Sequence, residues 1–232
     1  MTVPAAVLPQ ATAAVLQMPE LMSHPLLPPE SDGHFAYLMI FDDGVRIDLN
    51  IGTKPYMTEG EPAVVLLDKD GIFANLRPQK GYWHIQPPNE RIFLDCCNEF
   101  WWTLPYVAKG LWRGRVTYAL DTLNACVRPQ LLHMLSWLAG TRTGFAVSAG
   151  KSGADLPAYL PAGCWERYLS TYADAEPGHV WAAVFAAATL FLDAAHQTAE
   201  ALALPVNEAE AEGSLRYLYR VRELPADASE IF

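Results

Sequence analysis

The sequence has little cysteine and no recognisable metal-ligand spacing. Only four cysteines occur among 232 residues, and no CxxC pair is present, so neither a disulfide framework nor a zinc site is indicated. The adjacent Cys96 and Cys97 are predicted to be packed thiols in a reducing compartment. The six histidines show neither HxxxH nor HExxH spacing, which argues against a histidine metal site. We expect His133 to be packed in the core.

Positive charge is also scarce. Lys and Arg total 16 against 26 Asp and Glu, which gives a net charge of -10 and a pI near 5.0. This balance disfavours nucleic acid and anionic membrane surfaces as partners and mildly favours a cationic ligand. We expect no apolar run of membrane-spanning length, and the first residues lack the basic start of a secretory signal. A cytoplasmic globular protein is therefore predicted.

Residues 35–51 read as a β-hairpin. Phe35 to Phe41 is strand-like, Asp42-Asp43-Gly44 supplies a turn, and Val45 to Ile51 alternates between apolar and polar residues. The two-residue period of a strand places Asp48 on the polar face.

The rest of the chain changes from turns to helical periodicity. A short extended piece at 64–67, a DKDG turn at 68–71 and a proline-rich connector ending at Pro87-Pro88 precede Asn89, a predicted helix N-cap. Pro105 is expected to break or kink the first helix. Helices are predicted over 90–104, 106–122, 125–139, 155–172, 178–203 and 213–222. The predicted fold class is α+β, with an incomplete mixed-sheet domain at 1–88 followed by a helical bundle at 89–232.

The segment from Asp95 to Arg113 combines carboxylates, tryptophans and cations. At 3.6 residues per turn, Asp95, Glu99 and Trp102 share one helix face, opposite an apolar face that includes Phe100. Like charges one turn apart cost roughly 0.2–0.5 kcal/mol, so helix propensity does not explain the acidic pair. A solvated surface and a binding site for a cationic ligand both fit the pattern.

Gly150-Lys151-Ser152 resembles the end of a phosphate-binding P-loop, but that motif requires a glycine where this chain has Phe145. The turn from Ser148 to Gly153 can still offer amide donors and one lysine to a phosphate group. An ordinary loop between helices is the alternative.

Seven windows of the chain together resemble the aminoglycoside 6-adenylyltransferases, which transfer AMP from ATP to a hydroxyl of streptomycin. They are QMPE at 17–20, DGVRIDL at 43–49, LLDKD at 66–70, FLDCCNEFWW at 93–102, KGLWR at 109–113, GK at 150–151 and VRELPADASEIF at 221–232. The resemblance implies a nucleotidyltransferase with a mixed-sheet catalytic domain, a helical domain and a site where they meet.

The resemblance also implies three sheet carboxylates that bind Mg²⁺ and orient the acceptor hydroxyl. Asp48 matches the third of them, as both catalytic residue and metal ligand. The Gly-Ser and Asp-x-Asp signature of the other two has no counterpart before Gln17. We expect in-frame sequence upstream of Met1 to encode it, and we expect these 232 residues alone to show no adenylylation.

The helical half carries the remaining site residues that the resemblance implies. Three of them would bind the polycationic antibiotic: Asp95, Glu99 and Trp102. Three cations would reach the ATP triphosphate: Lys109, Arg113 and Lys151. Structural alternatives stay open: Arg113 and Arg115 also fit solvated helix charges. Trp101 and Trp112 are expected in the core rather than at a ligand.

Three functions follow as hypotheses. The first is an aminoglycoside adenylyltransferase that uses ATP and Mg²⁺ as a cytoplasmic monomer, without nucleic acid or membrane partners. The second is a catalytically inactive relic that still binds aminoglycoside or nucleotide. The third is a nonenzymatic helical interaction module.

Overall fold

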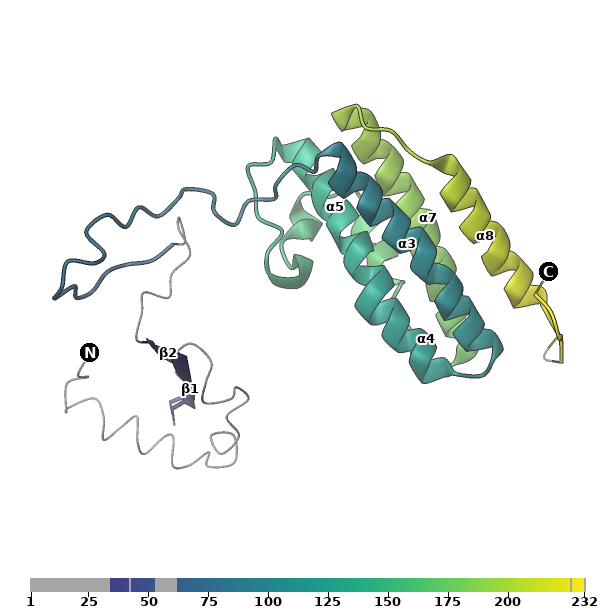
Figure 1. Ribbon diagram of the computed structural model, residues 1–232, viewed down its shortest axis with the longest axis horizontal. Coiled ribbons are helices and arrows are strands. Elements are labelled where there is room, and N and C mark those ends of the chain that lie inside the picture. Colours follow the sequence, from purple (N-terminus) through teal and green to yellow (C-terminus); the bar gives the residue numbers. More distant parts are fainter. Residues whose placement is uncertain (1–33, 42, 53–61, 226, 232) are drawn as a thin grey trace. The chain divides into compact units, whose positions relative to one another are not determined.

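The computed structural model describes residues 34–41, 43–52, 62–225 and 227–231. The QMPE window at 17–20 and Asp42 lie outside this range. The chain divides into two units, residues 1–79 and 80–232, which are described separately below. Figure 1 labels both strands and the helices α3, α4, α5, α7 and α8. In chain order the elements are β1 (His34–Ile40), β2 (Arg46–Gly52), α3 (Glu90–Trp112), α4 (Val116–Thr122), the π-helix η1 (Leu123–Val127), α5 (Arg128–Thr143), the 3₁₀ turns η2 (Lys151–Gly153) and η3 (Leu156–Ala158), α6 (Cys164–Leu169), α7 (Pro177–Leu202) and α8 (Glu208–Glu223).

In the first unit, the predicted hairpin is confirmed. Strands β1 and β2 pair antiparallel, with Leu38 opposite Asp48 and Met39 opposite Ile47. The turn closes through Gly44, whose φ of +82° suits glycine, and whose N–H donates to the Phe41 carbonyl at 2.9 Å. Among the described residues the sheet has only these two strands. The predicted DKDG turn also forms, because the Asp68 carboxylate accepts the amide hydrogens of residues 72 and 73.

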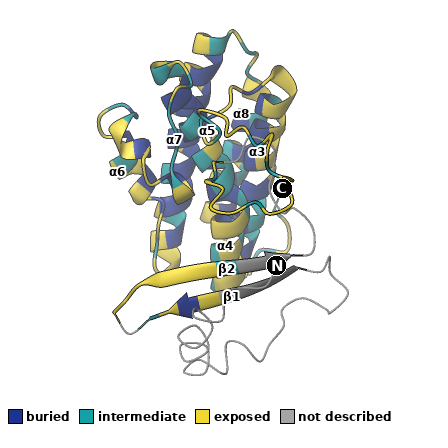
Figure 2. Ribbon diagram, turned by 90° about the vertical axis from the view of Figure 1, so that its left-hand side faces the viewer, coloured by how far each residue is buried: buried dark blue, intermediate teal, exposed yellow. Residues whose placement is uncertain are grey.

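In the second unit, α3 begins where the sequence predicted. The Asn89 side chain accepts the Ile92 N–H at 2.9 Å and caps the helix. The predicted division of its faces is confirmed, because Phe100 and Trp101 are buried while Asp95 and Glu99 are exposed. Figure 2 shows the helices dark blue where they face one another and yellow outside.

The expected break at Pro105 was wrong, because α3 runs through it to Trp112. A proline at this position has no N–H for the carbonyl of Trp101 four residues earlier. The hydroxyl of Ser214 on α8 donates to that carbonyl at 2.9 Å. A tertiary hydrogen bond therefore supplies what the proline removes. The chain reverses instead around Gly114, whose φ is +68°.

The continuous helix expected at 155–172 was also wrong. This stretch contains Pro157, Pro161 and Gly163, and the structure has the turn η3 and the short helix α6 in its place. Proline removes helical hydrogen bonds, and Gly163 takes a φ of +77° just before α6. The single helix expected at 106–122 was wrong as well, because α3 ends at Trp112 and α4 begins at Val116, on either side of Gly114. The helices predicted at 125–139, 178–203 and 213–222 exist, with boundaries shifted by a few residues.

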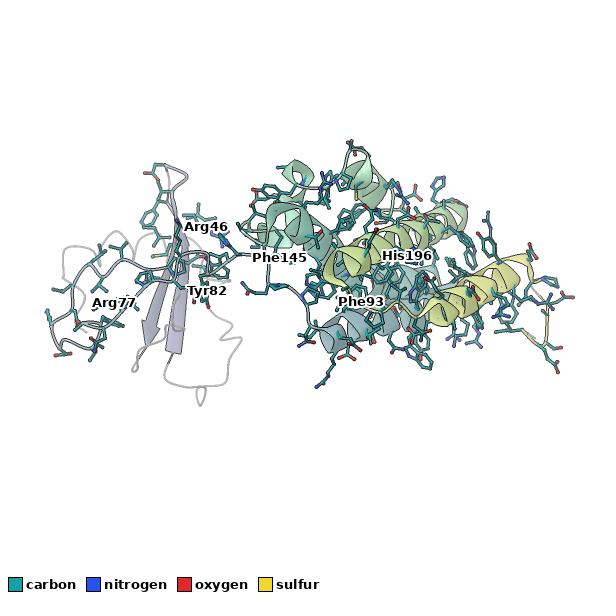
Figure 3. All side chains as sticks on the ribbon, turned by 90° about the horizontal axis from the view of Figure 1, so that it is seen from above. Arg46, Arg77, Tyr82, Phe93, Phe145 and His196 are labelled. Atoms are coloured by element: carbon teal, nitrogen blue, oxygen red, sulfur yellow. The ribbon has the colours of Figure 1, made fainter. Side chains whose placement is uncertain are left out.

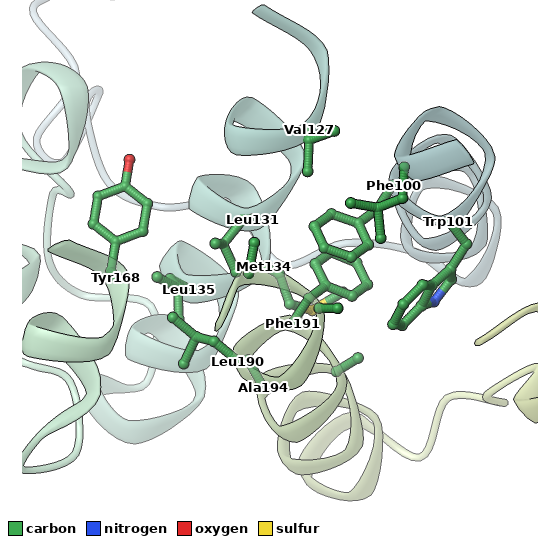
Figure 4. Close-up of a cluster of buried hydrophobic side chains, with 14 of the residues drawn as sticks. Phe100, Trp101, Val127, Leu131, Met134, Leu135, Tyr168, Leu190, Phe191 and Ala194 are labelled. Carbon is green, nitrogen blue, oxygen red and sulfur yellow. The ribbon is translucent and has the colours of Figure 1, made fainter. Parts of the chain in front are cut away.

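The core lies between α3, α5, α7 and α8. Phe100 on α3 stacks on Phe191 of α7 with ring centroids 3.7 Å apart, and Trp101 meets Phe191 edge-on at 5.6 Å, as Figure 4 shows. Four large aliphatic residues of α5 and α7 complete this layer: Leu131, Met134, Leu135 and Leu190. Figure 3 shows the side chains of the helices, with Phe93 labelled on α3 and His196 on α7.

Helix α7 is long and apolar enough to cross a membrane by length and composition, so the expectation of no such segment was wrong. Half of the relevant window is buried within the protein. Its small residues, such as Ala187 and Ala188, are almost fully covered by neighbouring helices. Its apolar composition is accounted for by its place in the core of the bundle.

The chain from Lys80 to Pro88 belongs with the helices. The Ile85 N–H donates to the Val147 carbonyl at 2.9 Å, and Ile85 and Pro88 are buried. The architecture is α+β, as predicted. The functional assignment of 1–88 as a nucleotidyltransferase domain and 89–232 as a ligand-binding domain stays a prediction.

Candidate functional site

A groove of about 1250 Å³ lies in the helical unit. It lies where α3 and α5 meet the segment before α3 and the loop after α5. Residues of both charges, three aromatic or imidazole rings and several amides and hydroxyls share this surface. Its lining includes Trp83, Ile85, Gln86, Ile92, Asp95, Cys96, Asn98, Glu99, Gln130, His133, Ser136, Trp137, Ser148, Gly150 and Lys151.

The acidic wall of the groove is the solvent face of α3. Asp95 and Glu99 lie one turn apart and both line the groove. The Glu99 carboxylate makes no hydrogen bond or ion pair with any described residue, while Asp95 lies 3.5 Å from the Arg91 guanidinium. That pair is largely exposed on both sides, so it contributes little stability and leaves the carboxylate accessible. Two carboxylates are thus available to a cation.

Lys151 brings positive charge to the same groove from the turn η2. The turn begins at Gly150, which has a φ of +70°. The amides of Gly150, Gly153 and Asp155 are already used within the loop, by Ser148 Oγ and by the carbonyls of residues 150 and 149. Lys151 is exposed, and its ammonium group is the positive charge that this loop brings to the groove.

Aromatic residues form another part of the groove. Trp83 is 63% exposed, whereas Trp137 is mostly buried and stacks with the ring of His133 at 6.3 Å. His133 is exposed and lines the groove. The expectation that His133 is packed in the core was wrong, because its position on α5 faces the groove rather than α7.

Cys96 also lines the groove but is buried. Burial raises the pKa of the Cys96 thiol well above its ordinary range and that of Cys97 to about 12. Both groups stay neutral thiols near pH 7, so neither provides a nucleophile or a metal ligand there. The prediction that the pair packs in the core is confirmed.

Lys109 and Arg113 lie in a different hollow. They line a pocket of about 320 Å³ near the end of α3, together with Tyr106, Arg115 and Tyr118. The Lys109 ammonium lies 4.6 Å from the centre of the Tyr106 ring. With a rise of about 1.5 Å per residue, the ten residues from Glu99 to Lys109 span roughly 15 Å along α3. The structure brings Lys151 together with the acidic pair and leaves Lys109 and Arg113 apart.

Trp102 shares the exposed stripe of α3 but does not line the groove. It is 63% exposed and contacts the Tyr106 ring edge-on at 6.1 Å. It lies one turn beyond Glu99, between the acidic and basic ends of the helix. Its predicted role in stacking on the antibiotic stays a prediction.

Asp48 lies in the other unit, exposed on β2. Its carboxylate pairs with Arg46, with 3.3 Å between Arg46 Nε and Asp48 Oδ1. Within residues 34–41, 43–52, 62–225 and 227–231, no group of three or more His, Cys, Asp or Glu residues is placed to hold a metal ion. A single carboxylate beside a guanidinium does not form a Mg²⁺ site by itself. Asp48 thus fits the place of one ligand, and the described residues do not complete such a site.

Comparison with known proteins decides the family. Residues 12–221 match the streptomycin adenylyltransferase family. The chain belongs to this family. The match includes both units, the hairpin that carries Asp48 and all residues that line the groove.

Three curated relatives of this family member are aminoglycoside 6-adenylyltransferases. The chain is 40% identical to the one from Campylobacter jejuni over 80% of its own length and 65% of the relative. It is 36% identical to the one from Bacillus subtilis strain 168, over 88% of its own length and 72% of the relative. It is 37% identical to the one from Staphylococcus aureus, over 68% of its own length and 57% of the relative. The chain thus spans about two thirds of the length of these relatives.

A solved structure agrees with this membership. The crystal structure of an aminoglycoside 6-adenyltransferase from Bacillus subtilis is similar with a TM-score of 0.58 and 30% identity, covering 87% of this chain and 76% of that one. The resemblance stated from the sequence windows is confirmed at the level of the family.

Proposed function

We propose that these 232 residues bind the aminoglycoside and the nucleotide in an aminoglycoside 6-adenylyltransferase. The proposed reaction transfers AMP from ATP to a hydroxyl of streptomycin or a related antibiotic. The observation that carries the proposal is the groove, which combines Asp95, Glu99 and Lys151 in a chain of the streptomycin adenylyltransferase family. Such a groove suits a reaction between a polycation and a polyanion.

The acidic wall is the antibiotic side. Glu99 and Asp95 accept charge-assisted hydrogen bonds from the cationic groups of the ligand, and burial of the pair by the ligand strengthens them. Gln130, Ser136 and Ser148 line the same groove and suit the hydroxyls of a sugar-like ligand. The similarity of the chain to three aminoglycoside 6-adenylyltransferases supports this substrate class.

The nucleotide side is assigned to the cations. Lys151 supplies a point charge to phosphate within the groove, and Lys109 and Arg113 offer a second basic surface along α3. Mg²⁺ accompanies ATP in this proposal and would neutralise charge on the phosphates. Asp48 is the one carboxylate of the hairpin proposed to hold the metal and to orient the acceptor hydroxyl. The protein is proposed to act as a monomer in the cytoplasm.

Calorimetric titration tests the ligand assignments. The purified 232-residue protein is expected to bind streptomycin and a nonhydrolysable ATP analogue. Failure of streptomycin to bind would overturn the proposal. Mass spectrometry of a mixture with ATP, Mg²⁺ and streptomycin measures transfer. From the sequence we expect binding without product, because only Asp48 of three implied carboxylates is present in these residues.

A further inference from the structure

We infer that Trp83 is a specificity-determining residue of the groove, and that its indole provides a flat face for a guanidinium group held at its edge by Glu99 and Asp95. The inference rests on the proposed function and deepens it. It predicts which cations of an aminoglycoside the groove selects: planar guanidinium groups rather than ammonium groups.

Trp83 is an unusual residue to leave open to solvent. It is 63% exposed, and within the described part of the chain its ring meets only that of Tyr82, edge-on at 4.8 Å. Its indole N–H has no hydrogen-bond partner among the described residues. A tryptophan side chain contributes favourable free energy by burying its large apolar surface, so an indole with uncovered faces still has free energy to gain from a contact. An open indole beside a groove is therefore a surface that a ligand can cover.

The backbone holds Trp83 in place at the groove. Two residues later, Ile85 is buried and its N–H donates to the Val147 carbonyl at 2.9 Å. The Ile85 anchor joins the segment before α3 to the loop after α5, the same loop that carries Lys151. Trp83 is thus presented by an ordered segment, so little conformational entropy is lost when a ligand binds.

The acidic wall provides the complementary part. Glu99 has no partner among the described residues, and Asp95 has only the exposed contact with Arg91. A guanidinium group is planar, donates two parallel N–H bonds to a carboxylate and stacks with its face on an indole. An ammonium group offers neither a flat face nor a fixed pair of donors. The combination of two accessible carboxylates and an open indole in one groove therefore favours guanidinium.

Trp102 is the competing residue. It is equally exposed, at 63%, and lies on the same helix as the carboxylates, but it does not line the groove. If Trp102 supplied the stacking surface, the guanidinium would have to lie along α3 outside the groove. The two tryptophans can therefore be compared directly in one experiment.

The test measures binding of two antibiotics to the 232-residue protein by calorimetry. Streptomycin carries guanidinium groups, and kanamycin carries only ammonium groups. Trp83→Leu is expected to weaken streptomycin binding about tenfold and kanamycin binding less than about threefold, as expected for loss of a stacked cation. Trp83→Phe is expected to keep most of the preference. Tyr219→Leu, which removes an exposed aromatic ring on α8, is the control and is expected to change neither.

Three results would overturn the inference. Equal losses for both antibiotics in Trp83→Leu would show that the indole is not selective for guanidinium. A large loss for streptomycin in Trp102→Leu with none in Trp83→Leu would assign the stacking surface to α3. Absence of streptomycin binding by the unmodified protein would overturn the proposed function itself, and so is distinguishable from the other two.

Discussion

Glu99 and Asp95 lie one turn apart on α3 but differ in their surroundings. Glu99 is without a partner among the described residues, whereas Asp95 has a guanidinium 3.5 Å away and a side chain that is 70% exposed. A carboxylate already compensated by a cation and by water has less to gain from a ligand. The two residues should therefore contribute unequally to antibiotic binding.

We predict that Glu99→Gln weakens streptomycin binding by roughly 1.5–3 kcal/mol, the usual contribution of a hydrogen bond to a charged partner. Asp95→Asn is expected to lie at the lower end of that range. Calorimetric titration measures both. Glu212→Gln, an exposed residue of α8 outside the groove, is the matched control. A larger loss for Asp95→Asn than for Glu99→Gln would contradict the assignment.

Lys151→Ala is predicted to show the reverse preference. It should weaken binding of a nonhydrolysable ATP analogue and leave streptomycin affinity unchanged or slightly improved, because a like charge is removed from the groove. Lys80→Ala serves as the control, since Lys80 is exposed and does not line the groove. If Lys151→Ala weakened both ligands equally, general destabilisation of the loop would be the explanation.

Asp48→Asn is predicted to leave folding intact. The residue forms an exposed ion pair with Arg46, and such pairs typically contribute about 0–1 kcal/mol. In any form of the protein that transfers AMP, the same change should abolish transfer, because it removes the one carboxylate of the hairpin assigned to metal and acceptor. Thermal unfolding and product detection by mass spectrometry measure the two effects. Full transfer by the variant would refute the assignment.

At the scale of elements, α3 depends on a residue from another helix. The carbonyl of Trp101, which Pro105 leaves without its helical donor, is satisfied by the hydroxyl of Ser214. We predict that Ser214→Ala costs roughly 1–3 kcal/mol of stability, because a buried carbonyl loses its partner. The cost should be smaller in a Pro105→Ala background, where residue 105 regains an N–H. A double-mutant cycle by urea unfolding measures the coupling, and strictly additive effects would exclude it.

The start of α7 is predicted to respond to pH. A hydrogen bond that the His179 ring donates to the Asp174 carboxylate raises the pKa of His179 above its ordinary value of 6.5. Backbone hydrogen bonds, from Glu176 N–H to Asp174 and from Gly178 N–H to Glu176, lower the pKa of those carboxylates below 3.8 and 4.5. His179 therefore contributes its full stabilisation of the folded state below pH 6.5, and this contribution is lost as the pH rises through its raised pKa. The carboxylate contributions are full above about pH 4.5 and are lost in acid.

The stabilisation from this cluster is therefore greatest between about pH 4.5 and 6.5. Comparison of thermal unfolding for the unmodified protein and His179→Ala at pH 5.5 and pH 8.5 provides the measurement. The difference in melting temperature should be larger at pH 5.5. An equal difference at both pH values would show that His179 acts through packing rather than charge.

The elements also show how far sequence patterns reach. Apolar periodicity and the Asn89 cap correctly predicted the start and faces of α3, and strand alternation predicted the hairpin. The extent of α3 beyond Pro105 was not predictable, because the compensating Ser214 lies more than a hundred residues away and local rules do not include it. The prediction of one helix over 155–172 was wrong for a local reason. The prolines in this stretch and Gly163 interrupt the helix although the apolar residues recur at helical spacing.

At the scale of the whole molecule, the core belongs almost entirely to one unit. Among the described residues, every buried apolar side chain except Met39 lies in residues 80–232. A two-stranded hairpin alone is marginally stable. All seven tryptophans also lie at or beyond Trp83, so intrinsic tryptophan fluorescence reports on the helical unit alone.

We predict that a fragment of residues 80–232 folds cooperatively, with a melting temperature within a few degrees of that of the full chain, because it keeps nearly all of the buried apolar surface. It should also bind streptomycin, since every residue that lines the groove is included. Circular dichroism and tryptophan fluorescence measure the unfolding. A broad, noncooperative transition in the fragment would show that the first unit stabilises the helices.

The site was only partly predictable at this scale. Charge and helical phase identified Asp95 and Glu99, and the GK turn identified Lys151, which the fold brings into the same groove. Trp83 and His133 were missed, because their place in the groove depends on contacts between the segment before α3, α5 and the loop after α5. The aromatic run Tyr82-Trp83-His84 ahead of Pro87-Pro88 was the one sequence signal that pointed there.

The groove has a consequence for inheritance. All the side chains that line it come from a single stretch between Trp83 and Lys151. A single short exchange of coding sequence between related genes could therefore replace the whole recognition surface at once, while the hairpin with Asp48 stays unchanged. Under the proposed function, preference for a different ligand would then change by recombination rather than by many separate substitutions.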